Sequence, residues 1–262
     1  YHAAGPSQNG VELRFTEAVS CADNIMTARL VIKQEAAQQG MFASFMPKPI
    51  ATAPGSAMFL YQSLLDHDGE NLFWAPKEFH PAHLSEVAQH YVAGLLKYAP
   101  EFTLVANPTV NSYKRFISTG EVPTHATWGR KNRSALVRIP THKPGKHIAT
   151  RLELRSPDPS CNPYLVIGLI LAAGLDGIEK KMPLPAPVNR NLFHKRAAEG
   201  LESLPESLRE AITIAAQSDF IAKELPVPLM NKYFEYQTQL CHGYESAPDP
   251  QAWERENCFL KI

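Results

Sequence analysis

The sequence predicts an α+β fold in which an antiparallel sheet has helices packed on one side. Short stretches that alternate apolar and polar residues indicate half-buried strands. Longer stretches with apolar residues every three or four positions indicate amphipathic helices that pack against a sheet. The chain has 262 residues, which is enough to bury a large core, and it contains no internal repeats.

The first elements are expected to be strands interrupted by one helix. Residues 11–15 alternate between apolar and charged or polar side chains, which predicts a half-buried strand. A helix is expected at 23–39, where apolar residues form a single stripe. Two further strands are expected at 41–46, which is closed by prolines, and at 57–65.

The middle of the chain contains the clearest patterns. Apolar residues at 84–96 follow helical spacing closely and predict a helix against the sheet. Two strands are expected at 136–139 and 150–154, joined by the basic loop 142–147. Residues 164–180 form the most apolar segment and predict a buried helix, with a proline tolerated at its start.

Two more helices are expected towards the end of the chain. Residues 203–206 have the spacing of a capping box, which predicts a helix through about Gln217. A second helix is expected at 230–240, and the proline-rich segment 182–188 is expected to be a loop.

Composition excludes several classes of function. Lysine plus arginine and aspartate plus glutamate both number 26, so no global field favours nucleic acid or an anionic membrane. The longest apolar run spans about twelve residues, short of the roughly twenty that a membrane span needs, and the first residues do not resemble a signal peptide. The four cysteines have no metal-type spacing, so reduced thiols in a cytoplasmic protein are expected.

Two strand-like runs carry an unusual concentration of arginine. Arg151, Glu153 and Arg155 alternate along one strand and therefore point to the same face. Arg133 and Arg138 precede them in the neighbouring run. Three interpretations are open: a ladder of salt bridges, a clamp for an anionic ligand, or a glutamate kept ionised as a metal ligand.

The run that carries Arg133 and Arg138 begins Asn132-Arg133-Ser134-Ala135. The segment from Asn132 to Asn162 resembles the catalytic core of glutamine synthetase, class I type. The resemblance extends over nearly the whole chain, and its blocks keep the family's order and approximate spacing. The blocks lie at 45–49 with 55–58, 107–115, 132–140, 151–165 and 172–178.

The resemblance implies a curved, mostly antiparallel open sheet flanked by helices, and a single catalytic-type domain over residues 1–262. It also implies ATP-dependent joining of ammonia or an amine to the side-chain carboxylate of glutamate, through an acyl phosphate. ATP and two Mg²⁺ or Mn²⁺ ions are the implied cofactors, and a glutamate-like molecule is the implied substrate. Family members form large rings, so a homo-oligomer is expected as well.

Site roles follow from the resemblance position by position. Arg115 and Arg155 resemble the residues that hold the glutamate carboxylates, and Gly55 the glycine whose backbone lies against glutamate. Arg133 and Arg138 resemble phosphate contacts, and Arg133 is counted with the catalytic residues. The remaining implied residues are Arg151 at a nucleotide phosphate, Ser63 near the nucleotide and Glu121 as the flap glutamate that accepts a proton from the amine.

The sequence departs from the family mainly at the metal ligands. Gly10 and His2 stand where the family has glutamates, Phe59 where it has a metal-binding histidine, and Tyr61 where it has a histidine near the nucleotide. Glu153 is the one ligand retained. Two further family glutamates and the small N-terminal domain align upstream of the first residue.

Three hypotheses of function follow. The first is a degenerate synthetase-like protein without normal metal-dependent ligase activity. The second is an active glutamine synthetase or γ-glutamyl-amine ligase, represented by an N-terminally truncated chain. The third is a structural ring-assembly or regulatory subunit. An altered metal site built from His2, Glu12 and Glu153 is an alternative within the second hypothesis.

Overall fold

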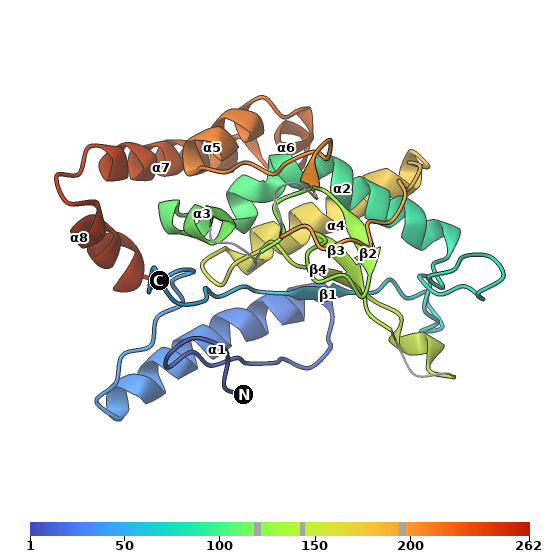
Figure 1. Ribbon diagram of the computed structural model, residues 1–262, viewed down its shortest axis with the longest axis horizontal. Helices are drawn as coiled ribbons and strands as arrows, with labels where there is room; N and C mark the ends of the chain where they lie inside the picture. Colours follow the sequence, from blue (N-terminus) through green and yellow to red (C-terminus); the bar gives the residue numbers. More distant parts are fainter. Residues whose placement is uncertain (118–121, 142–144, 194–197) are drawn as a thin grey trace.

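The computed structural model describes residues 1–117, 122–141, 145–193 and 198–262 (Figure 1). Its centre is a small four-stranded sheet of β1 (Leu60–Gln62), β2 (Trp128–Arg130), β3 (Val137–Ile139) and β4 (Leu152–Leu154). The strand order is β1-β4-β3-β2. β4 is antiparallel to both of its neighbours, and β2 is parallel to β3. The predicted α+β class with a mostly antiparallel open sheet is therefore confirmed.

Two long helices, α2 (Glu86–Ala106) and α4 (Pro163–Glu179), form the centre of the core. They pack against each other and against the sheet face that carries Leu152 and Leu154, both fully buried. The predicted helices at 84–96 and 164–180 are confirmed, and α2 is ten residues longer than predicted at its C-terminal end. Asn162 caps α4 by accepting hydrogen bonds from the backbone of its first turn, with Pro163 at the first helical position.

A further helical layer lies on the far side of α2 from α1 (Figure 1). It contains α5 (Leu208–Ala216), α6 (Asp219–Glu224) and α7 (Val227–Glu245), followed by α8 (Pro250–Glu254) and a π-helical turn at Arg255–Phe259. The short helix α3 (Val110–Ile117) contacts α7, and a 3₁₀ turn covers His147–Ala149. The chain ends at a carboxyl terminus near α8 (Figure 1).

The helix α1 (Ala18–Gln38) lies along the opposite edge of the molecule, against α4 (Figure 1). It begins five residues before the predicted start. Its 21 residues include two buried side chains, Ala22 and Ile25. α7, with 19 residues, also has two buried side chains, so α1 and α7 are the least buried of the long helices.

Several predictions of elements were wrong. Residues 11–15 and 41–46 are not strands: 11–15 has no regular secondary structure and is exposed, and neither segment pairs with a described strand. The expected strand at 57–65 shortens to β1. The cap of α5 is Ser207, which accepts a hydrogen bond from the Glu210 backbone, rather than Ser203. β2, α3, α6 and α8 were not predicted.

Candidate functional site

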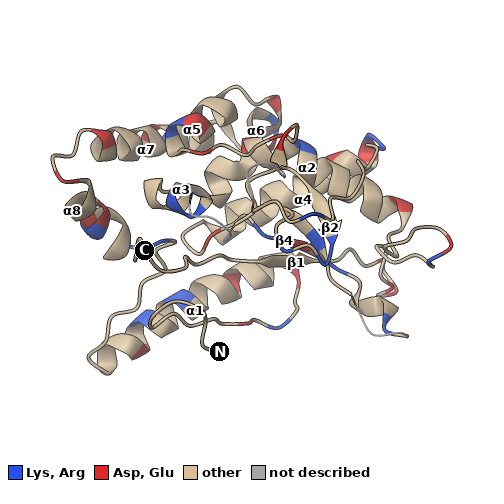
Figure 2. Ribbon diagram, in the orientation of Figure 1, with Lys and Arg blue, Asp and Glu red and all other residues tan. Residues whose placement is uncertain are grey.

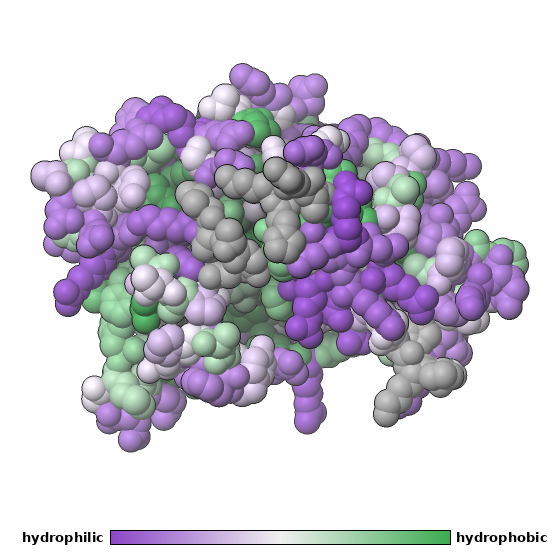
Figure 3. All heavy atoms as spheres, viewed as in Figure 1, coloured by the Kyte–Doolittle hydropathy of each residue, from purple (hydrophilic) through white to green (hydrophobic). Residues whose placement is uncertain are grey.

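The face of the sheet opposite α2 and α4 carries the charged residues singled out in the sequence. In the strand register, Tyr61 of β1 lies beside Glu153 of β4, which lies beside Arg138 of β3. Arg151 and Arg155 flank Glu153 at two-residue spacing and so share its face. In Figure 2 the ribbon of the sheet includes segments in the colour of lysine and arginine, and Figure 3 shows a hydrophilic surface over the same place. We call this surface the arginine face.

A buried ion triad holds the arginine face together. Glu153 is 1% exposed, and each of its two carboxylate oxygens pairs with a different arginine: Oε2 with Arg138 and Oε1 with Arg155. Arg155 also donates from Nε to the carbonyl of Arg133, at 3.0 Å. Desolvation by burial is the main reason why the pKa of Arg155 is lowered, against the opposing effect of Glu153. The carboxylate is therefore neutralised by arginines on both sides.

Aromatic side chains occupy the two positions where the family resemblance places histidines. The guanidinium carbon of Arg155 lies 4.3 Å from the centre of the Phe59 ring, and that of Arg151 lies 5.1 Å from the centre of the Tyr61 ring. Both contacts are cation–π interactions. Burial, followed by the charge of Glu153, raises the pKa of Tyr61. Phe59 and Tyr61 thus support arginines here, and phenylalanine has no lone pair to offer a metal.

Two arginines remain available on this face. Arg133 and Arg151 are both exposed. Arg151 donates to the carbonyl of Ala149 at 3.3 Å, whereas the described part of the chain gives the Arg133 guanidinium no hydrogen-bond partner. Arg138 is partly exposed, and its Nε is buried without a hydrogen-bond partner in the described structure. At the edge of the sheet, Ser63 donates to the Thr150 carbonyl at 2.9 Å.

Arg115, on α3, is fully buried and differs from the others. Its guanidinium donates to the carbonyls of Ser56 and Ser156, at 3.1 and 3.0 Å, and to Oδ1 of Asn107 at 2.5 Å. Gly55 adjoins this cluster, and its carbonyl accepts a hydrogen bond from the Gln8 side chain. The structure therefore surrounds Arg115 with protein acceptors, where the sequence predicted contact with a ligand carboxylate.

The donor set does not fit a two-metal centre. Within the described ranges, no group of three or more histidine, cysteine, aspartate or glutamate residues could hold a metal ion, so His2, Glu12 and Glu153 do not form one. Both oxygens of Glu153 are taken by arginines. At Gly10, a Cβ atom would lie 2.2 Å from the Tyr1 ring, which covers this position. Glu121 lies outside the described residues.

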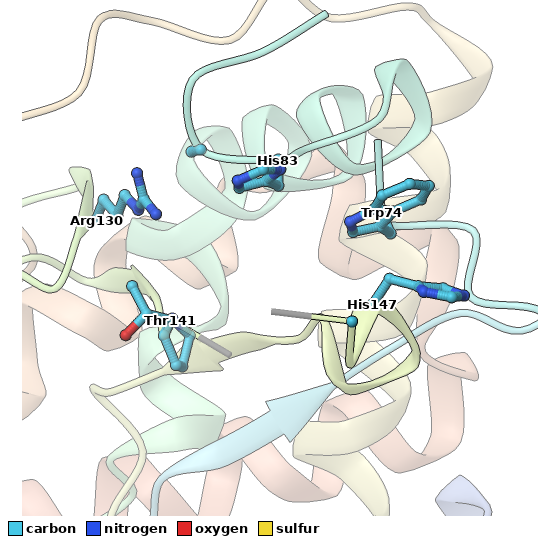
Figure 4. A pocket seen from close by; sticks show the side chains of 8 residues that line it. Trp74, His83, Arg130, Thr141 and His147 are labelled. Carbon is cyan, nitrogen blue, oxygen red and sulfur yellow. The ribbon is translucent and has the colours of Figure 1, made fainter. Parts of the chain in front are cut away.

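A separate cavity of ≈ 350 Å³ opens on the other side of the sheet. Arg130 of β2 lines it together with Trp74, His83, Thr141 and His147 (Figure 4). Arg130 is in register with Ile139, whose buried side chain belongs to the core face. The lining includes none of the residues predicted to form the site, so the cavity and the arginine face are distinct.

A family model described as "Glutamine synthetase, catalytic domain" matches residues 1–257. The chain belongs to the glutamine synthetase family. It is 41% identical over 254 residues to a glutamine synthetase of Mycolicibacterium smegmatis, covering 95% of this chain and 56% of that protein. It is also 41% identical over 258 residues to the glutamine synthetase of Methanosarcina mazei, covering 97% of this chain and 56% of that protein.

Solved structures agree with this assignment to the family. Apo GmaS superposes with a TM-score of 0.80 at 33% identity, over 92% of this chain and 53% of that one. A GmaS/ADP complex gives a TM-score of 0.79 at 32% identity, over 92% of this chain and 54% of that one. The chain thus spans about half the length of the relatives that it matches. None of the described helices is long and apolar enough to cross a membrane.

Sequence reasoning placed the arginine face but missed its aromatic supports. Phe59 and Tyr61 were recognised as departures from a metal site, and their spacing of two residues is the signal that both face the arginines. The pairing of Glu153 with Arg138 required the strand register, which short strands do not reveal in sequence.

Proposed function

We propose that this synthetase-type domain binds a small anion, a glutamate-like carboxylate or a nucleotide phosphate, on its arginine face without metal-dependent ligation. The observation that carries the proposal is the pairing of both Glu153 oxygens with arginines, beside a phenylalanine at a ligand position. Mg²⁺ and Mn²⁺ need several oxygen ligands. The described residues gather no such set.

The remaining donors suit an anion. Arg133 and Arg151 are exposed, and the guanidinium group offers a rigid fork that matches carboxylate and phosphate oxygens. Arg138 and Arg155 add a net positive charge to this face, since these two arginines share a single glutamate, Glu153. The GmaS/ADP complex supports a nucleotide as one such ligand.

The other predicted residues fit supporting roles in this proposal. Arg115 fixes the backbone at Ser56 and Ser156, and so positions the segment that contains Gly55. Ser63 ties β1 to the residue before Arg151 through the Thr150 carbonyl. The family role of Glu121 as a proton acceptor has no function in a domain that does not ligate.

A second candidate is an active glutamate–ammonia or glutamate–amine ligase in which further chain completes the site. The specific observation in its favour is that the match covers only 56% of each of the two synthetases named above. Additional carboxylates from that further chain would then have to hold the metal ions together with Glu153, in competition with its two arginines.

Calorimetry and an activity assay separate the two candidates. We titrate ATP into the protein in EDTA and again in excess Mg²⁺, and we measure ADP release with glutamate and ammonium. The proposal expects ATP binding of similar affinity in both buffers and no ADP release. Magnesium-dependent ADP release that requires glutamate would instead establish the second candidate.

Matched variants test the location of the site. Arg133→Gln and Arg151→Gln should each weaken ATP binding about ten-fold, since each removes charged hydrogen bonds. Arg130→Gln is the control, because Arg130 is an exposed arginine of the same sheet on the opposite face. Equal affinities for all three variants would place the bound anion elsewhere.

A further inference from the structure

The outward face of α1 carries a stripe of exposed apolar residues that no described part of the chain covers. Val19, Met26 and Leu30 are 70%, 43% and 67% exposed. At roughly 100° per residue, these three positions fall on one narrow arc of the helix. Ala37, also exposed, lies on the same arc about two turns beyond Leu30. The inward face, with Ala22 and Ile25, packs against α4 and is distinct from this stripe.

Two opposite charges border the stripe. Asp23 lies near its start and Lys33 near its end, within the same arc of the helix. The carboxylate of Asp23 accepts a hydrogen bond from the Tyr164 hydroxyl at 2.5 Å, which holds it at this edge of α1. The Lys33 ammonium donates a long hydrogen bond, 3.5 Å, to the Lys261 carbonyl. The helix therefore presents an apolar stripe that is acidic at one end and basic at the other.

The stripe is complementary to itself when reversed. If two α1 helices lie antiparallel about a two-fold axis midway between Met26 and Leu30, each Met26 meets the other copy's Leu30. The same operation brings Asp23 opposite Lys33, and Val19 opposite Ala37. Apolar residues then meet apolar residues, and each negative charge meets a positive one. A parallel arrangement would instead stack like charges.

We propose that two copies of this chain associate through an antiparallel pair of α1 helices, with Met26 and Leu30 at its centre and Val19 opposite Ala37 at its ends. An isologous two-fold contact is the commonest form of association between identical chains. One helix pair is a small interface, so we expect a reversible dimer of micromolar affinity. None of the residues proposed for the contact belongs to the arginine face.

Sedimentation equilibrium over a range of micromolar concentrations tests the dimer. The unchanged chain should show a monomer–dimer equilibrium. Leu30→Glu should weaken association at least ~30-fold, because it sets a charge in the centre of the contact. Val31→Glu is the matched control: Val31 is 49% exposed on the same helix but points about 100° away from Leu30.

A charge swap tests the antiparallel register. Lys33→Asp alone should weaken the dimer about ten-fold, because it places two acidic groups opposite each other on both sides of the axis. Combining it with Asp23→Lys should restore most of the affinity, since each swapped pair is attractive again. Tyr164→Phe controls for the lost hydrogen bond to Asp23 and should leave the dimer unchanged.

Three results would overturn the proposal. The unchanged chain could sediment as a monomer throughout, which would mean that another partner or another segment covers α1. Val31→Glu could dissociate the dimer as strongly as Leu30→Glu, which would place the contact elsewhere. The double charge swap could fail to restore the affinity lost in Lys33→Asp, which would exclude the antiparallel register.

Discussion

At the scale of single residues, the chemistry of the arginine face is decided by Glu153. A carboxylate that is 1% exposed needs partners for its charge. In a metal site, cations would supply the balancing charge; here Arg138 and Arg155 supply it. The aromatic rings beneath Arg155 and Arg151 favour the same state, since both stabilise guanidinium groups and Phe59 has no lone pair to offer a metal. The aromatic residues that replace the family's histidines, Phe59 and Tyr61, are thus physically consistent with the retained arginines and Glu153.

Glu153→Gln should destabilise the fold strongly. The substitution keeps the shape of the side chain but leaves two largely buried arginines without a counter-charge, which costs about 3–5 kcal/mol. Urea unfolding followed by circular dichroism measures the change. Glu245→Gln is the control, because its pair with Arg209 is exposed and should contribute less than ~1 kcal/mol. A loss below that of the control would show that the triad does not stabilise the sheet.

At the scale of elements, the contact between α2 and α4 organises the core. The two helices approach so closely that a Cβ atom at Gly94 would lie 2.1 Å from the Ala173 carbonyl oxygen and 2.9 Å from Cα of Gly177. Backbone therefore packs on backbone at this crossing. The close approach positions α4, and α4 in turn begins just after the strand that carries Glu153.

Gly94→Ala should destabilise the protein, because neither backbone atom in its way can move without shifting a helix. We expect a loss of about 2 kcal/mol or more, as for other overpacked cores. Gly168→Ala tests the same change where a Cβ atom meets nothing within 4 Å on α4, and it should instead stabilise by about 0.5–1 kcal/mol. Thermal unfolding of both variants measures the difference. Equal effects would show that the two helices can separate at little cost.

The same elements show how far the sequence could predict the fold. The patterns at 84–96 and 164–180 were sufficient to predict two helices, because long segments of this apolar character indicate helices and not strands. The alternation at 11–15 is equally regular, yet an isolated strand has no hydrogen-bond partner, and pairing cannot be read from one segment. β2 has three residues, too few to show a period. The positions of Arg138 and Glu153 were predicted, but their contact depended on the register between β3 and β4.

At the scale of the whole molecule, the domain divides into a well-buried body and one exposed helix. The body contains the sheet, α2, α4 and the layer of α5, α6 and α7, all of which contribute residues to the two clusters of described core residues, whereas α1 contributes none to either cluster. Burial of apolar surface is the main source of stability. The free energy of local opening should therefore be lowest for α1 among the long helices.

Hydrogen exchange should reveal this division, and it should also respond to association. In dilute protein, the amides of α1 should exchange much faster than those of α2 and α4, because opening α1 exposes little apolar surface. At high concentration the α1 amides should become protected, since a dimer that forms through this helix stabilises it by mass action. Mass spectrometry of peptic peptides at two protein concentrations measures both effects. In the Leu30→Glu variant, α1 should exchange fast at both concentrations, while α2 and α4 stay unchanged. If the α1 amides were as protected as those of α2 in dilute protein, the division into a buried body and an exposed helix would be wrong. If the protection of α1 did not change with protein concentration, the proposed dimer would be wrong.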